Sequence, residues 1–195
     1  MSKSSDFICV DDFEKYALRT LPRNAADYYR SGANEEQTLR ENREAFKRLR
    51  LRPRFLRDVS KRRLNTSILG HNIPFPVCVA PSAMHRMAHP DGEIATVKEV
   101  LPEIVRAVAG CCEVYLDGGV RNGTDVLKAL ALGAKAVFIG RPILWGLAHS
   151  GESGVRKILQ ILKEEFDTAM ALSGCATIDD IKPSLVVRQE SYSRL

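Results

Sequence analysis

The stretch LDGGVRNGTDVLKALALGAKAVFIGRPILWGLA, residues 116–148, contains two apolar strands that each end in a glycine turn. The first strand is predicted within 112–120 and closes on DGG, and the second lies within 134–142 and closes on GRP. Between them, residues 122–133 carry apolar side chains at helical spacing and end in glycine. A strand, a helix and a second strand in this order predict a parallel βαβ unit.

A third apolar strand is predicted at 76–80, where PVCVA fits a strand buried on both faces. It follows a short strand that begins at Thr66 and a turn at 70–72. Apolar residues at helical spacing predict four further helices, at 10–21, 24–33, 34–49 and 151–174. Three apolar strands that alternate with helices are typical of an α/β fold with a parallel sheet.

Residues at the ends of the N-terminal helices indicate where these helices stop and start. Gly32 suits a left-handed cap at the end of the second helix. Asn34 suits the N-cap of the third helix, with Glu35 and Glu36 in a first turn where the helix dipole favours negative charge. Adjacent helical residues point in different directions, so one of Tyr28 and Tyr29 is expected to be buried and the other exposed.

The composition is that of an ordinary globular domain, with 195 residues, 45% hydrophobic and 27% charged. No apolar run approaches the roughly 20 residues that cross a bilayer, and the N-terminus lacks the apolar core of a signal peptide. Five cysteines without CxxC spacing favour reduced thiols in an intracellular protein over a disulfide framework or a zinc site. His85 and His89 lack partners at ligand spacing, so no metal site is predicted.

The net charge of +5 is concentrated in residues 47–63, KRLRLRPRFLRDVSKRR. A nucleic-acid site is one interpretation, but no nucleic-acid motif accompanies the segment. The favoured interpretation is a set of solvated arginines around a packed apolar edge formed by Leu49, Leu51, Phe55 and Leu56.

The two glycine turns predict a phosphate site. Glycine after a parallel strand lets the backbone approach an anion, and the N-terminus of the following helix adds a favourable dipole. Arg121 and Arg141 add a guanidinium to each turn, and guanidinium groups bind phosphate bidentately. Either turn alone is better explained as a tight turn with a surface arginine, but the pair favours a phosphate cradle like the one after strands 7 and 8 of βα barrels.

Residues 116–148 resemble the flavin-phosphate segment of the FMN-dependent (S)-2-hydroxyacid oxidases, the glycolate oxidase family. DYYRSGANEEQTLRENREAFKRLRLRPR (27–54), PVCVAPSAMHRMAHPDGE (76–93) and EEFDTAMALSGC (164–175) resemble the same family, in particular its animal peroxisomal members. The resemblance covers nearly the whole chain. It implies an FMN cofactor, a small 2-hydroxy acid substrate and a fold related to the TIM (β/α)8 barrel.

The resemblance also implies roles for individual residues. Pro81, Ser82 and Ala83 would line the flavin ring, and Tyr28 would contact the substrate carboxylate. The ribityl chain and phosphate of FMN would be held by Asp117, Gly118, Gly119, Val120, Arg121, Gly140 and Arg141.

The family's catalytic segment is missing. The resemblance implies that the general base is a histidine in an SNHGGRQLD-like segment, whose arginine binds the substrate carboxylate. The chain's four histidines, His71, His85, His89 and His149, lie in other contexts. Since a base must lie within hydrogen-bond reach of the proton it takes, no catalytic residue is retained and the chain is expected to be inactive.

The missing segment has a definite position near residues 98–100. Pro102 interrupts what otherwise looks like one helix over 92–108, and proline fits the first turn of a helix better than its middle. We therefore interpret this stretch as a seam between the family's first barrel helix and the helix before its seventh strand. Splicing or a faulty gene model explains the seam equally well. The chain is then a single shortened domain (1–195) with four parts. These are an N-terminal helical segment (1–65), the first barrel unit (66–98), the last two barrel units (99–182) and a tail (183–195).

The chain is thus expected to be an incomplete barrel that retains strands resembling 1, 7 and 8. Two strand orders are open. The order 7-8-1 is that of the complete barrel and keeps the flavin residues together, but its connection between strands 1 and 7 runs against the right-handed preference of βαβ crossovers. The order 1-7-8 satisfies that preference but moves Ala83 away from the phosphate turns.

The final tripeptide, Ser193, Arg194 and Leu195, resembles the Ser-Lys-Leu peroxisomal address. It predicts a peroxisomal protein that an import receptor recognises. Two functions remain open: an oxidase by descent that does not turn over, and a noncatalytic remnant that associates with full-length subunits. A homo-oligomer is compatible with either.

Overall fold

The fold is described from a computed structural model over residues 7–82 and 113–189. The first of these ranges contains α1 (Val10–Thr20), α2 (Arg23–Arg30), α3 (Gln37–Lys47), β1 (Leu49–Leu51), β2 (Thr66–Ile68), β3 (His71–Ile73) and β4 (Val77–Val79). The second contains β5 (Tyr115–Asp117), α6 (Gly123–Ala131), β6 (Ala136–Ile139), α7 (Arg141–Leu172), two single-turn 3₁₀ helices and β7 (Val186–Arg188). None of the helices in these ranges is long and apolar enough to cross a membrane.

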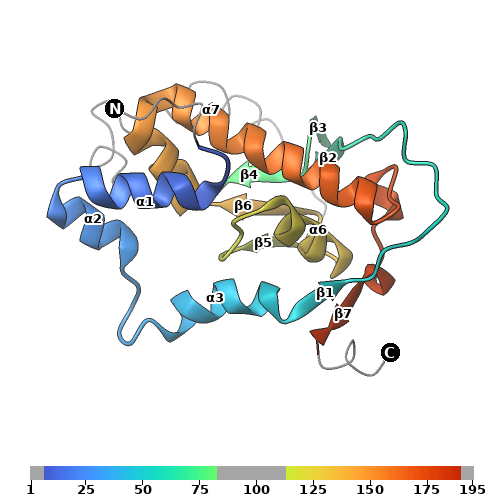
Figure 1. Cartoon of the computed structure of the whole chain (residues 1–195), viewed down its shortest axis with the longest axis horizontal. Coiled ribbons are helices and arrows are strands. Elements are labelled where there is room, and N and C mark those ends of the chain that lie inside the picture. Colours follow the sequence, from blue (N-terminus) through green and yellow to red (C-terminus); the bar gives the residue numbers. More distant parts are fainter. Residues whose placement is uncertain (1–6, 83–112, 190–195) are drawn as a thin grey trace.

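A parallel three-stranded sheet in the order β4-β6-β5 lies at the centre of the molecule (Figure 1). β4 pairs with residues 137–139 of β6, and β5 pairs with residues 136–138 on its other side. The strand predicted at 76–80 therefore lies beside the strand that ends in the second glycine turn, which confirms the order 7-8-1 over the alternative 1-7-8. Within the described residues this sheet is open and forms no closed barrel.

The hydrophobic core lies between the sheet and the helices α1, α6 and α7. Val137 and Ile139 of β6 are buried in it together with Trp145 of α7 and Phe13 of α1. Burial of each large apolar side chain contributes about 1.5–3 kcal/mol, so these contacts are the main source of stability. The core thus depends on α1, a helix that precedes every strand in the sequence.

The helix α7 is interrupted where the predicted helix at 151–174 begins. Ser150 and Gly151 have non-helical backbone angles, and Gly151 has a φ of +60°. Across this kink Gly146 and Gly154 touch, since a Cβ on Gly154 would lie 1.9 Å from the carbonyl oxygen of Gly146. The two parts of α7 can therefore pack against each other only because both positions lack a side chain.

The structure corrects the predicted helix caps and the position of one predicted turn. α2 ends at an extended Ser31, and Gly32 does not adopt the left-handed conformation. The N-cap of α3 is Glu36, not Asn34. The turn predicted at 70–72 is formed by Leu69 and Gly70, and His71 and Asn72 already belong to β3, which pairs with β2 in an antiparallel hairpin.

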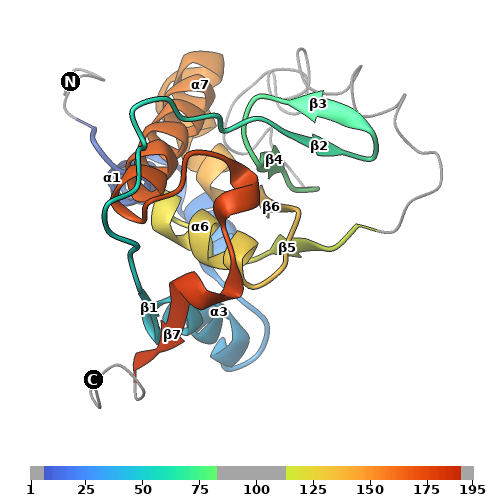
Figure 2. The same cartoon turned by 90° about the vertical axis from the view of Figure 1, so that its right-hand side faces the viewer.

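The basic segment between β1 and β2 is attached to the C-terminal part of the chain (Figure 2). The Arg54 guanidinium donates to the carbonyl oxygens of Gly174 and Asp180, at 3.2 and 2.8 Å. Arg62 binds the Asp167 carboxylate through two hydrogen bonds of 2.7 and 2.6 Å. Leu51 packs against the core, but Phe55 and Leu56 are exposed, so the predicted packed apolar edge is wrong for these two residues.

Replacing Asp167 by asparagine is expected to lower the free energy of unfolding by about 1 kcal/mol at neutral pH, because the bidentate pair with Arg62 is lost. Hydrogen bonding from Arg62 holds the pKa of Asp167 below its usual value of 3.8. The contribution is thus present above 3.8 and is lost as the pH falls through the lower pKa of the folded state.

Urea unfolding at neutral pH and below pH 3.8 measures this effect. Glu164→Gln, on an exposed neighbouring position of α7, is the matched control and should change little. A destabilisation by Asp167→Asn that persists unchanged in acid would rule out the ion pair as its cause.

Candidate functional site

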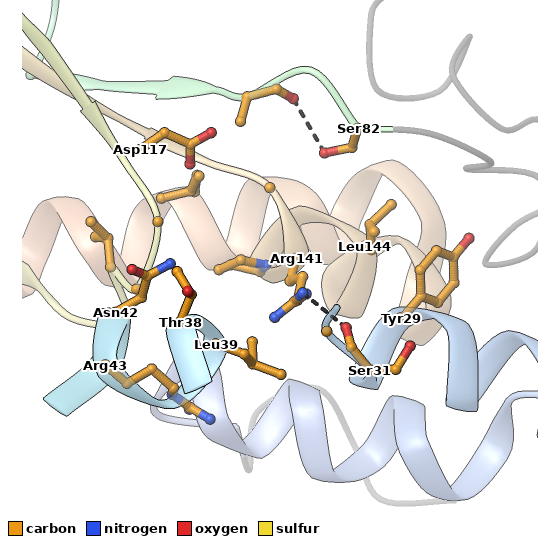
Figure 3. Close-up of a pocket in the computed structure, with 18 of the residues that line it drawn as sticks. Tyr29, Ser31, Thr38, Leu39, Asn42, Arg43, Ser82, Asp117, Arg141 and Leu144 are labelled. Atoms are coloured by element: carbon orange, nitrogen blue, oxygen red, sulfur yellow. Dashed lines mark hydrogen bonds between the residues drawn. The ribbon is translucent and has the colours of Figure 1, made fainter. Parts of the chain in front are cut away.

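A cleft with a volume of about 1250 Å³ lies at the carboxyl ends of the parallel strands and is covered on one side by α2 and α3 (Figure 3). It brings together every predicted site residue that the structure describes. These residues are Tyr28, Pro81, Ser82, Asp117, Gly118, Gly119, Val120, Arg121, Gly140 and Arg141. Ala83 lies outside the described residues.

The first glycine turn follows β5 and packs directly against α3. Gly118 and Gly119 have φ values of +101° and +77°, a conformation that side chains rarely adopt. A Cβ on Gly119 would lie 2.0 Å from the Asn42 carbonyl oxygen. Glycine is thus required here both by the turn and by the close approach of α3.

The N-terminus of α6, after the first turn, is occupied by the chain's own side chains. The Asp125 carboxylate accepts hydrogen bonds from the amides of Arg121 and Asn122, at 3.1 and 3.3 Å. The Gly123 amide donates to Glu165 at 2.8 Å, and burial raises the pKa of both carboxyl groups. The predicted contribution of a helix N-terminus to anion binding is therefore wrong for the amides of α6.

The second glycine turn leaves a helix N-terminus open. Gly140 is the N-cap of α7, and no side-chain hydrogen bond caps this end. A Cβ on Gly140 would lie 3.1 Å from the Ser82 hydroxyl, so β4 and the start of α7 border the cleft at close range. The positive end of the α7 dipole is the one that is available to an anion.

Arg121 is a buried cation without full compensation. Its side chain is only 13% exposed, and its Nε has no hydrogen-bond partner in the structure. The carboxylate of Glu14 lies 4.0 Å from that nitrogen. Burial lowers the pKa of Arg121, and the positive charges of Arg43 and Arg141 lower it further. An anion beside this guanidinium would supply the missing hydrogen bonds and charge.

The other two arginines of the cleft differ in how fully they are engaged. Arg43 is paired with carboxylates of α1, Asp11 at 2.8 Å and Glu14 at 3.1 Å. Arg141 makes one hydrogen bond of 3.1 Å to the Ser31 carbonyl oxygen and points across the cleft (Figure 3). Arg141 therefore retains donors that can turn toward a ligand, whereas Arg43 serves mainly to hold α3 on α1.

The family model for FMN-dependent dehydrogenases matches the chain in two stretches, residues 17–100 and 98–188. This chain belongs to the FMN-dependent dehydrogenase family. FMN is the cofactor of this family.

Curated relatives agree with this assignment. The chain is similar to human 2-hydroxyacid oxidase 1, with 31% identity over 355 aligned positions that span 92% of this chain and 96% of that protein. It is also similar to a peroxisomal (S)-2-hydroxyacid oxidase of Arabidopsis thaliana, with 29% identity, 88% of this chain and 94% of that protein. These relatives support an oxidoreductase of 2-hydroxy acids as the family function.

Solved structures of low identity show the same fold. A flavocytochrome b2 mutant superimposes with a TM-score of 0.89 at 22% identity, covering 100% of this chain and 90% of that one. A soluble mutant of (S)-mandelate dehydrogenase from Pseudomonas putida gives a TM-score of 0.85 at 19% identity, covering 94% of this chain and all of that one. These neighbours are TIM barrels, whereas the described residues of this chain have an α/β architecture without a closed barrel.

The two adjacent tyrosines of α2 differ in burial, as the helical spacing predicts. Tyr29 is 3% exposed, and its ring packs against Trp145 with centroids 5.9 Å apart. Tyr28 is 47% exposed and lines the cleft. Tyr29 lines the cleft as well, so the two tyrosines differ in exposure and not in their access to the cleft.

No histidine is among the described residues that line the cleft. His71 lies in β3, and His149 packs against the rings of Phe7, Phe13 and Tyr16, with centroids 4.5–5.2 Å away. His85 and His89 lie outside the described residues, as does Pro102. Nor do the described residues contain three His, Cys, Asp or Glu side chains arranged to hold a metal ion.

The contribution of α3 to the cleft could not be predicted from the sequence. Thr38, Leu39 and Asn42 of this helix line the wall opposite the first glycine turn. Their polarity and spacing are those of any surface helix, so no local pattern marks them. The only signal is indirect: the paired glycines after β5 require a close neighbour, but the sequence does not say which.

Proposed function

We propose that this chain is a shortened FMN-dependent (S)-2-hydroxyacid oxidase that holds FMN by its phosphate and does not complete substrate oxidation. One observation carries the proposal: both glycine turns and both of their arginines line one cleft. A guanidinium from each turn and an uncapped helix N-terminus provide three sources of positive potential for a phosphate dianion.

The chemistry of the cleft fits the phosphate end of FMN. Arg121 and Arg141 are the groups that would bind the phosphate oxygens, because each has donors that the protein does not use. We assign the ribityl chain and the rest of the phosphate contacts to the turns, namely Asp117, Gly118, Gly119, Val120 and Gly140. Pro81, Ser82 and Ala83 would line the ring. When bound in an intact oxidase, FMN accepts two electrons from the substrate and passes them to oxygen, which gives hydrogen peroxide.

The proposed inactivity follows from the lack of a base. Tyr28 can donate a hydrogen bond to a substrate carboxylate, but a hydroxyl that donates in this way is not the base that the reaction needs. The chain has no SNHGGRQLD-like segment, and no described histidine lies at the cleft. Substrate could therefore be oriented without being deprotonated.

Two findings support an internal deletion as the origin of this gap. The two stretches that match the family model meet at residues 98–100, where the sequence predicts the seam. The alignment to the human oxidase spans 355 positions although the chain has 195 residues. A large part of that relative is therefore aligned with gaps in this chain.

We expect the chain to bind FMN far more tightly than riboflavin, which lacks the phosphate. Flavin fluorescence titration of the purified chain measures both affinities. Since charge-assisted hydrogen bonds contribute about 1.5–3 kcal/mol each, the two ligands should differ by roughly 100-fold or more. Equal affinities for FMN and riboflavin would refute a phosphate cradle, and no binding of either would refute the proposed function.

The proposed location is the peroxisome, through Ser193, Arg194 and Leu195, which lie outside the described residues. A peroxisomal relative supports this. Fusion of residues 184–195 to a fluorescent reporter tests it. A punctate signal that coincides with a peroxisomal marker is expected, whereas a diffuse cytosolic signal would exclude the address.

A second candidate, a noncatalytic subunit that associates with full-length oxidase, is favoured by the open sheet. β4 and β5 each pair with β6 alone among the described strands, so each leaves one edge unpaired. Exposed strand edges pair readily with other chains. Co-expression of tagged chain and full-length oxidase should then give a mixed complex, and its absence at comparable expression would eliminate this candidate.

A further inference from the structure

Two large apolar side chains project into solvent next to each other on residues 52–63, which we call the strap. Phe55 is 82% exposed and Leu56 is fully exposed. Leu56 also has a φ of +57°, a left-handed conformation that residues with a side chain rarely adopt. Neither the cleft nor the core uses these side chains, so their exposure needs another explanation.

The strap holds these two side chains in a defined place. On one side, Arg54 is fixed by its backbone amide, 3.3 Å from the Ser173 carbonyl oxygen, and by its guanidinium bonds to the C-terminal segment. On the other side, Arg62 is fixed to Asp167. Figure 2 shows the segment running beside the C-terminal part of the chain between these contacts. The apolar pair is therefore presented outward from a segment that is anchored at both ends.

The surroundings of the apolar pair are strongly basic. Arg52, Arg57, Lys61 and Arg63 have exposed side chains within the strap, and Asp58 is its only carboxylate. Two carboxylates outside the strap pair with it, Asp180 with Arg57 at 3.7 Å and Asp167 with Arg62 at 2.6 Å. A further apolar residue, Leu172, is exposed at the end of α7, beside the Ser173 that binds the strap. The patch thus combines an apolar tip with a border in which positive charges outnumber negative ones.

The positive charge of this patch favours an anionic binding partner over a second copy of the chain. A symmetric contact with a second copy would bring the same arginines face to face, and the net charge of +5 on each chain would add to their repulsion. An anionic lipid surface offers an apolar layer for Phe55 and Leu56 and negative headgroups for the cationic border. We propose that the strap is a peripheral anchor through which this protein binds anionic bilayers reversibly.

The test is sedimentation of the full chain with vesicles of phosphatidylcholine alone and of phosphatidylcholine with phosphatidylserine. The chain should bind the anionic vesicles at least about tenfold more strongly than the neutral ones, and high salt should weaken that binding. The double variant Phe55→Ser/Leu56→Ser should lose about tenfold or more of the binding, since two apolar side chains no longer enter the bilayer. Phe55→Trp should show a blue-shifted emission with anionic vesicles, over the constant signal of the buried Trp145.

Leu132→Ser, at an exposed position of another helix end, is the matched control and should bind vesicles like the unmodified chain. Thermal unfolding of every variant checks that the fold is retained, which the exposure of the changed residues favours. Absence of binding to anionic vesicles overturns the proposal. So does binding that Phe55→Ser/Leu56→Ser leaves unchanged, or a dimer that this variant converts to monomer while vesicle binding is not detected.

Discussion

Replacing Arg121 by methionine is expected to weaken FMN binding by roughly 10- to 100-fold, while riboflavin binding changes little. The guanidinium is buried and its Nε has no partner, so it is already desolvated and free to bind a phosphate oxygen. Methionine keeps much of the side chain's apolar volume but removes every donor. Fluorescence titration with both flavins measures the loss.

Arg19→Met is the control for this substitution, because Arg19 is exposed on α1 and does not line the cleft. Loss of Arg121 leaves Glu14 paired with Arg43, so the fold should be retained. If Arg121→Met binds FMN as tightly as the unmodified chain does, Arg121 is not part of the phosphate site and the assignment of the first turn fails.

Replacing Gly119 by alanine is expected to destabilise the chain by about 3 kcal/mol or more. The new Cβ would lie 2.0 Å from the carbonyl oxygen and 2.5 Å from the carbonyl carbon of Asn42, both backbone atoms of α3. Either α3 or the turn must move, and the change also forces alanine into a φ of +77°. Urea or thermal unfolding measures the loss, and FMN binding should fall with it.

Gly70→Ala separates these two causes. Gly70 has nearly the same φ, +80°, and nothing lies within 4 Å of a Cβ built there. This variant should cost only the backbone strain, about 1 kcal/mol. Equal destabilisation by the two alanines would show that α3 does not pack on the glycine turn.

The parts of the fold that were predictable are those with a local pattern. The βαβ unit of residues 116–148 has strands with continuous apolar runs and a helix that ends at Ala131, two residues before Gly133, whose φ is +107°. Tyr28 and Tyr29 were separable because helical geometry alone places adjacent residues on different faces. The strand order 7-8-1 was one of two open alternatives, since handedness and family resemblance pointed in opposite directions.

The parts that were not predictable depend on contacts between distant residues. β1 and β7 are three residues each and pair across most of the chain, and a strand so short carries no readable period. Asn34 was a reasonable N-cap by residue type, but Glu36 takes that position with a φ of +58°, and Gly32 instead packs against Leu39. At the site, Asp125 accepts hydrogen bonds from the amides of Arg121 and Asn122, just before α6, and Glu165 accepts one from the first amide of α6, Gly123. A sequence pattern cannot distinguish this arrangement from an open helix N-terminus.

Anaerobic mixing of the FMN-loaded chain with glycolate and with a longer (S)-2-hydroxy acid tests the proposed function most directly. A chain that holds FMN without a base should retain its oxidised-flavin absorbance and should release no hydrogen peroxide when oxygen is admitted. Human 2-hydroxyacid oxidase 1, assayed in parallel, is the positive control. Loss of flavin absorbance that depends on substrate, followed by peroxide in proportion, would contradict the inactivity and would require a base that the cleft does not show.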